Sequence, residues 1–271
     1  MQTCSLVFLD IDGTLLDSNH QIMPRTKQLL NRLEKRGIPI ILCSARSPGG
    51  VETVERQAEL HSPIVCYGGS LILTADRAVL SDTGMALETA VSFKRFVLDR
   101  FKDVVVSAYS YGAWLVDDAG HPAIRREARI SQCVPLEEDL RTAAAPPPRV
   151  HKLLCIGTRQ QITAIQDSAA AAFPELTLSR SGPIYLEVMP KGVSKRTAAE
   201  RLGEYFGVAG ERMAAFGDNF VDLELLRYAG LGVAMGNAPP EVRQAADQVT
   251  ASNDGEGIYL ALRRLRFSAP Q

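Results

Sequence analysis

The feature that most constrains the fold is an alternation of short apolar segments with amphipathic ones. CSLVFLD (residues 4–10) and IPIILCSAR (38–46) have the length of buried strands, and PRTKQLLNRLEKRG (24–37) between them has apolar residues at helical spacing. Pro24 stands where a first helical position is expected, and Gly37 where a helix ends. Buried strands that alternate with helices predict a parallel sheet covered by helices on both faces.

The alternation stops in the middle of the chain and then resumes. PIVCYGGSLIL (63–73) is interpreted as a third strand, but paired strands with few intervening helices follow, and Pro146–Pro148 indicate a loop. After Met189, helix and strand patterns alternate again. We therefore predict an α/β fold. Its Rossmann-like parallel core comprises residues 1–81 and 186–271, and an α+β cap of residues 82–185 is inserted into it.

Composition excludes several classes of protein. The 271 residues carry 30 Lys and Arg against 31 Asp and Glu, a net charge of −1, so no charged surface for nucleic acid or a membrane is indicated. The five cysteines are scattered without a CxxC pair, which argues against a disulfide framework or a zinc site. No membrane-spanning run or signal-like N-terminus is visible, so we expect a cytoplasmic protein. The oligomeric state is open, with a monomer slightly favoured.

Carboxylates follow two of the predicted strands. Asp10 and Asp12 end the first apolar run, and FGDNFVD (216–222) places Asp218 and Asp222 at a later strand end. Ligands of open α/β sheets bind beyond the carboxyl ends of the strands, so these side chains are expected at one edge. Neighbouring carboxylates are costly without a cation, and oxygen ligands suit Mg²⁺. We therefore predict a Mg²⁺ site.

A metal held by carboxylates favours a phosphate substrate. Ser44 at the end of the second strand and Lys195 at a helix start could hold phosphate oxygens. The chain lacks GxxxxGK[ST] and GxGxxG, which excludes the P-loop and dinucleotide-binding motifs. No activated Ser or Cys stands beside a base, so a carboxylate is the expected nucleophile.

Four segments in this order resemble the motifs of the haloacid-dehalogenase-like (HAD) phosphatases. They are DIDGT (10–14), SAR (44–46), Lys195 and GDNFVD (217–222). Three further segments are similar to the Cof-like subfamily, type IIB, which has a large α+β cap: EVMPKGVSK (187–195), VAMGNA (233–238) and SNDGEGI (252–258).

The resemblance implies a role for each catalytic residue. Asp10 would attack phosphorus and become an aspartyl phosphate. Asp12 would protonate the leaving alcohol and then deprotonate the attacking water. Ser44 and Lys195 would hold the phosphoryl oxygens.

The resemblance also implies the metal ligands. Mg²⁺ would be held by Asp10, the backbone carbonyl of Asp12, and Asp218. Asp222 would complete the site by orienting a water at the metal, or Lys195.

Two positions depart from the family pattern. Val221 stands where an asparagine is usual in the last motif, and Gly68 stands where YGGS replaces the usual NGA. The asparagine commonly reaches a phosphate oxygen, so a donor is lost. Because the four aspartates and Lys195 remain, we expect weaker activity or a shifted substrate.

The function expected is a Mg²⁺-dependent phosphomonoester hydrolase of a small metabolite, either a sugar phosphate or a phosphorylated cofactor such as FMN or pyridoxal phosphate. Two alternatives stay open. A phosphosugar mutase would share the fold and nucleophile but return the phosphoryl group to a sugar. A weakly active phosphometabolite-binding protein would need neither Asp10 nor Asp12, and both are present.

Overall fold

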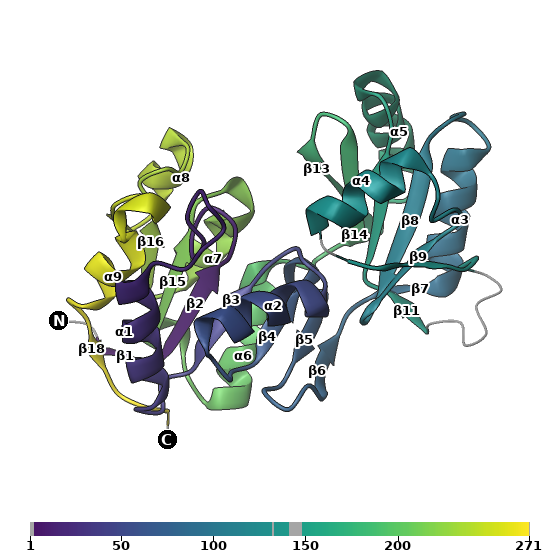
Figure 1. The fold of residues 1–271 in the computed structure, drawn as a ribbon. Coiled ribbons are helices and arrows are strands. Elements are labelled where there is room, and N and C mark those ends of the chain that lie inside the picture. The colour runs from purple at the N-terminus through teal and green to yellow at the C-terminus, as the bar shows by residue number, and fades with distance from the viewer. Residues whose placement is uncertain (1–2, 132, 141–147, 271) are drawn as a thin grey trace. The chain divides into compact units, whose positions relative to one another are not determined.

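The protein consists of two compact units (Figure 1). The computed structural model describes residues 3–131, 133–140 and 148–270, so Pro146 and Pro147 of the predicted loop lie outside the described residues. The first unit, called the core, comprises Met1–Ala45, Val51–Ser81 and Ser194–Gln271. The second, called the inserted unit, comprises Arg46–Gly50 and Asp82–Val193.

An eight-stranded sheet forms the centre of the core, in the order β17-β16-β15-β2-β3-β4-β5-β6. The neighbours from β17 to β4 pair in parallel. The predicted α/β fold with a parallel sheet is thereby confirmed. The strands are β2 (Leu6–Asp10), β3 (Ile40–Cys43), β4 (Ile64–Cys66), β5 (Leu71–Leu73), β6 (Val79–Asp82), β15 (Met213–Gly217), β16 (Leu231–Ala234) and β17 (Gln248–Val249).

The prediction of one strand over residues 63–73 is wrong. β4 and β5 are two antiparallel strands separated by a 3₁₀ turn, Tyr67–Gly69. Tyr67, Gly68 and Gly69 all have positive φ angles, of 51°, 64° and 118°. Three successive residues in that region cannot continue an extended strand, so the chain reverses.

Helices cover the core sheet, as the apolar spacing predicts. α1 begins at Pro24 as expected but ends at Glu34, because Gly37 forms a turn whose N–H donates to the Glu34 carbonyl. All residues of β2, β3 and β15 are buried, which is typical of a sheet covered on both faces. The helices are α1 (Pro24–Glu34), α2 (Pro48–Ala58), α6 (Lys195–Phe206), α7 (Leu223–Tyr228), α8 (Pro240–Ala245) and α9 (Gly257–Leu262). A parallel pair, β1 (Thr3–Cys4) and β18 (Arg266–Phe267), joins the chain ends.

A six-stranded sheet forms the inserted unit, in the order β10-β9-β8-β12-β14-β13. α3 and α5 pack on one face, where Phe93 and Ile162 belong to a single buried cluster. The strands are β8 (Val105–Ser110), β9 (Ala113–Val116), β10 (Pro135–Glu137), β12 (Lys152–Ile156), β13 (Leu176–Gly182) and β14 (Tyr185–Pro190), and β7 (Met85–Ala86) pairs with β11 (Arg149–Val150). The helices are α3 (Leu87–Leu98), α4 (Pro122–Ser131) and α5 (Arg159–Ala172).

Among the described residues, no helix combines the length and the apolar character needed to cross a membrane.

Candidate active site

Three neighbouring strands bring the predicted site residues to one edge of the core sheet. β2 lies between β3 and β15, and all three run in parallel. Asp10 ends β2 opposite Cys43, so Ser44 follows at the adjacent strand end. Asp218 follows the last residue of β15 on the other side. The topology therefore gathers segments that lie more than 200 residues apart in the sequence.

The carboxylates form a close cluster. One oxygen each of Asp10, Asp218 and Asp222 lies within 4.8 Å of the others. Asp10 and Asp222 are buried, and Asp218 is half-buried. Like charges at this separation repel one another strongly away from water, so the cluster requires positive charge nearby.

Lys195 supplies one positive charge. It is the first residue of α6, whose N-terminus is fixed by a reciprocal pair of hydrogen bonds between Ser194 and Thr197. The Lys195 side chain is only 4% exposed, and its Nζ donates to Asp10 Oδ1 and, at 2.6 Å, to Asp222 Oδ1. A lysine at a helix start is ordinarily a surface residue, so its burial between two carboxylates makes Lys195 a candidate site residue.

Burial and charge act on these groups in opposite directions. Burial raises the pKa of Asp10, the neighbouring carboxylates of Asp222 and Asp218 add to this, and Lys195 opposes it. Burial alone would lower the pKa of Lys195, but the contacts with Asp10 and Asp222 outweigh it and raise that pKa. The ammonium therefore stays charged.

Asp222 holds the loop after β15 in place. Its Oδ2 accepts hydrogen bonds from the backbone N–H groups of Asp218 and Asn219, at 3.1 and 3.0 Å. Since Oδ1 accepts from Lys195, both oxygens are engaged. This arrangement suits Asp222 to orienting Lys195 and Asp218.

The Asp218 carboxylate packs directly against the segment that follows Asp10. Thr14 Oγ1 donates to Asp218 Oδ1 at 2.9 Å. Gly13 has a φ of +79°, and a Cβ at this position would lie 2.4 Å from Asp218 Oδ2. Only glycine allows this approach. Thr14 was not singled out from the sequence, although its place in DIDGT was the available signal.

Asp12 and Ser44 differ in their surroundings. Asp12 is exposed and directly follows the buried Ile11. Ser44 is buried, its N–H donates to the Val65 carbonyl, and its carbonyl accepts from the Gly68 N–H. The turn that contains Gly68 thus fixes the Ser44 backbone.

Comparison with known proteins identifies the family. The model of the haloacid dehalogenase-like hydrolases matches residues 7–262. The chain belongs to the haloacid dehalogenase-like hydrolase family. The resemblance inferred from the four motifs is thereby confirmed, and with it the expectation of a HAD-like phosphatase.

Relatives of this HAD-like chain match it along nearly its whole length. A putative phosphatase of Haemophilus influenzae is 36% identical, over 94% of this chain and 96% of that protein. A Bacillus subtilis protein named 5-amino-6-(5-phospho-D-ribitylamino)uracil phosphatase is 28% identical, over 95% and 96%. A solved structure from Thermotoga maritima is similar with a TM-score of 0.90 at 25% identity, over 99% of this chain and 100% of that one.

The departure from the usual HAD motif is visible in the loop after β15. Val221 is 63% exposed within the short 3₁₀ turn Phe220–Asp222. The Asn219 side chain caps this turn by accepting from the Phe220 N–H at 2.7 Å. The side-chain oxygen of Asn219 is therefore engaged locally.

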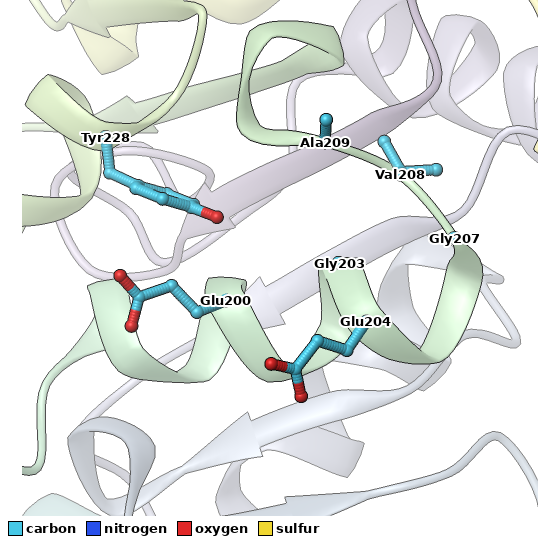
Figure 2. A pocket seen from close by; sticks show the side chains of 7 residues that line it. All are labelled: Glu200, Gly203, Glu204, Gly207, Val208, Ala209 and Tyr228. Carbon is cyan, nitrogen blue, oxygen red and sulfur yellow. The ribbon is translucent and has the colours of Figure 1, made fainter.

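A separate hollow of about 450 Å³ lies on the core surface (Figure 2). Its lining comes from the middle and the C-terminal end of α6, the segment after it and Tyr228, whereas Lys195 is the first residue of that helix. Glu200 and Glu204 give it an acidic character. The hollow is therefore distinct from the HAD-like carboxylate cluster.

Proposed function

We propose that this chain is a Mg²⁺-dependent phosphomonoester hydrolase that acts on a small phosphorylated metabolite through an aspartyl phosphate. The observation that carries the proposal is the position of Asp10. It ends the central strand β2, lies in the carboxylate cluster and contacts the buried Lys195. A carboxylate nucleophile and a cation for the developing charge are thus adjacent.

The donor set fits a divalent cation. Three clustered carboxylates face one ammonium, so the cluster holds more acidic groups than Lys195 alone can neutralise. Hard oxygen ligands suit Mg²⁺, and Asp10, Asp218 and the Asp12 carbonyl are the groups that would hold it. When bound, Mg²⁺ would neutralise phosphoryl oxygens and hold them toward the nucleophile.

The residues of the chain divide the chemistry between them. An Asp10 oxygen forms a bond to phosphorus while the bond from phosphorus to the leaving oxygen breaks, and Asp12 gives that oxygen a proton. Water then attacks phosphorus, Asp12 takes up its proton, and the Asp10 carboxylate leaves. Lys195 and the Ser44 hydroxyl bind the phosphoryl oxygens throughout. The products are an alcohol and inorganic phosphate.

The proposed substrates are sugar phosphates and phosphorylated cofactors. One relative is named for a compound with a phosphate on a ribityl chain, a sugar alcohol. That name supports the inclusion of sugar and sugar-alcohol phosphates, together with FMN and pyridoxal phosphate, in a substrate panel.

The test measures phosphate release from this panel with Mg²⁺ or EDTA, for the parent, Asp10→Asn and the control Asp76→Asn. Asp76 is a suitable control because its side chain is 94% exposed on a core turn. We expect Mg²⁺-dependent release that Asp10→Asn abolishes and Asp76→Asn leaves unchanged. Release that persists in Asp10→Asn would overturn the assignment of the nucleophile.

The same assay separates the hydrolase from its alternatives. Phosphate release without added sugar bisphosphate excludes a pure mutase. If the folded, Mg²⁺-loaded parent binds panel compounds without turnover, the binding-protein alternative replaces the hydrolase.

A further inference from the structure

An asparagine that the four motifs do not include contacts the carboxylate cluster. Asn237 lies in the turn after β16, and its Nδ2 donates to the Gly13 carbonyl at 2.8 Å and to Asp218 Oδ2 at 3.4 Å. Since Thr14 donates to the other Asp218 oxygen, both oxygens of this carboxylate accept hydrogen bonds from neighbouring side chains. All of these residues belong to the core.

The orientation of the Asn237 amide is determined by its partners. Its Oδ1 accepts from the backbone N–H of Asn253 at 3.1 Å. The Nδ2 side faces two acceptors, the Gly13 carbonyl and Asp218. A flipped amide would place donor against donor on one side and oxygen against oxygen on the other, so only one orientation is compatible with the site.

The 3₁₀ turn Asn253–Gly255 is in turn fixed to the segment after Asp10. Asn253 Nδ2 donates to the Leu16 carbonyl at 2.9 Å. Asp254 accepts from the N–H and the Oγ of Ser18, at 2.8 and 2.7 Å. The donor to Asn237 therefore stands on a turn that is held at two points.

We propose that Asn237 is a positioning residue that sets the affinity of the carboxylate cluster for a divalent cation. This inference rests on the proposed function. Asn237 fixes the Asp218 carboxylate in one rotamer before the cation arrives, and Asn253 fixes Asn237. Loss of a residue that orients a metal ligand typically lowers metal affinity by about 10–100-fold.

The experiment titrates the metal-free full chain with Mn²⁺, following free Mn²⁺ by electron paramagnetic resonance, and with Mg²⁺ by calorimetry. We expect Asn237→Ala to raise the Kd for both ions by about 10-fold or more. Asn253→Ala should raise it less, because the backbone N–H that donates to Asn237 remains. Asn19→Ala, an exposed change in the loop after Asp17, is the matched control and should bind as the parent does.

The Asn237→Asp variant tests whether the hydrogen-bond donor of Asn237 is required, or only a polar side chain of the same shape. Aspartate has the same shape and adds a negative charge but cannot donate to Gly13 or Asp218. We expect it not to restore the parent Kd, and a Kd at or below that of the parent would overturn the proposal. Phosphate release by Asn237→Ala should recover to within a few-fold of the parent at saturating Mg²⁺, because Asn237 acts on cation affinity.

The outcomes distinguish this inference from the proposed function. A parent that binds neither ion overturns both. If the parent binds the ions and Asn237→Ala binds them equally well, only the role of Asn237 is overturned. A lower melting temperature of Asn237→Ala in EDTA with an unchanged Kd would reveal a purely structural role and would also overturn it.

Discussion

Lys195 and Asp222 form a buried ion pair that links α6 to the loop after β15. Lys195 Nζ lies 2.6 Å from Asp222 Oδ1, and the Asp222 side chain is completely buried. Because the second Asp222 oxygen accepts two backbone N–H groups, the pair fixes that loop as well as the ammonium. A buried ion pair contributes little net stability, because both charges lose their hydration on folding. Removing one partner is nevertheless strongly destabilising, because the other charge then stays buried without compensation.

We predict that Lys195→Met inactivates and destabilises the protein. Three clustered carboxylates would then lack their ammonium, which costs about 3–5 kcal/mol of unfolding free energy in typical buried pairs. Phosphate release should fall by about a hundredfold or more, as when a donor to the transition state is lost. Urea unfolding in EDTA measures the stability, with the exposed Lys191→Met as control. An unchanged unfolding midpoint would contradict the role assigned to Lys195.

Removing a carboxylate should have the opposite effect on stability. Asp218→Asn relieves repulsion within the cluster. Its amide oxygen can still accept from Thr14, and only the longer hydrogen bond from Asn237 Nδ2, at 3.4 Å, is lost. We therefore expect Asp218→Asn to melt at a higher temperature than the parent in EDTA. Added Mg²⁺ should stabilise the parent by about 2.7 kcal/mol at a Mg²⁺ concentration of a hundred times its Kd, and so raise its melting temperature. The melting temperature of Asp218→Asn should not change when Mg²⁺ is added. Equal stabilisation of both proteins by Mg²⁺ would remove Asp218 from the metal site.

Gly13→Ala should disable the site through geometry alone. The new Cβ would lie 2.4 Å from Asp218 Oδ2, and the φ of +79° is strained for alanine. We expect activity to fall at least tenfold, with about 1–3 kcal/mol lost in unfolding free energy. Gly112→Ala is the matched control, because nothing lies within 4 Å of its Cβ position and its φ is not positive. The prediction is checked by enzyme kinetics and urea unfolding of both variants. Equal losses of activity and stability in Gly13→Ala and Gly112→Ala would refute it.

The sequence was sufficient to predict those residues of the candidate site whose positions depend only on where the strands end. Asp10, Ser44 and Asp218 could be placed together because parallel neighbours present their carboxyl ends at one edge. The contacts of Thr14 and Asn237 could not be predicted in this way, since their partners lie 204 and 224 residues away and depend on loop geometry.

Two structural features could not be predicted from local sequence patterns. Tyr67 adopts a positive φ, which its residue type does not favour, so the reversal between β4 and β5 has only the glycine pair as a signal. The burial of Lys195 depends on tertiary contacts with Asp10 and Asp222, and no local pattern distinguishes it from a surface lysine.

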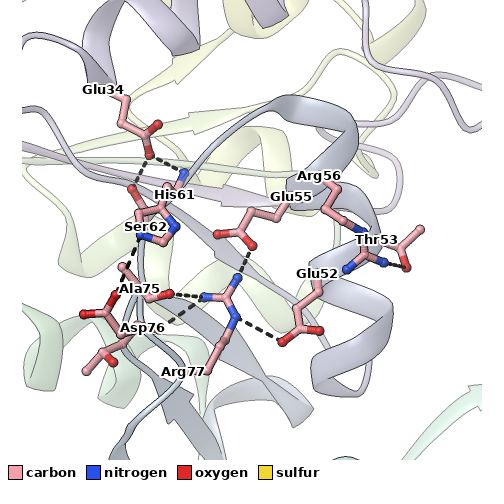
Figure 3. A network of polar contacts seen from close by, with 11 residues as sticks. Glu34, Glu52, Thr53, Glu55, Arg56, His61, Ser62, Ala75, Asp76 and Arg77 are labelled. Carbon is pink, nitrogen blue, oxygen red and sulfur yellow. Dashed lines mark hydrogen bonds and ion pairs between the residues drawn. The ribbon is translucent and has the colours of Figure 1, made fainter.

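Glu55 should make the stability of the core depend on pH. It is 5% exposed on α2, and Oε2 accepts from Arg77, which also contacts Glu52 (Figure 3). Within the described part of the chain, Glu55 Oε1 has no hydrogen-bond partner. Burial raises the pKa of Glu55, and Arg77 only partly opposes it.

The sign of the effect follows from the raised pKa. The folded protein retains the Glu55 proton to a higher pH than the unfolded chain does. In the unfolded chain a glutamate has a pKa of about 4.3. Stability from this group is therefore greatest at low pH and falls as pH rises through the raised folded-state pKa. Glu55→Gln, which cannot titrate, should gain stability relative to the parent between pH 4 and pH 7, measured by urea unfolding in EDTA.

Glu59→Gln is the control, since Glu59 is 68% exposed and should show no such trend. A Glu55→Gln difference that stays constant across this range would show that the carboxyl is ionised equally in both states.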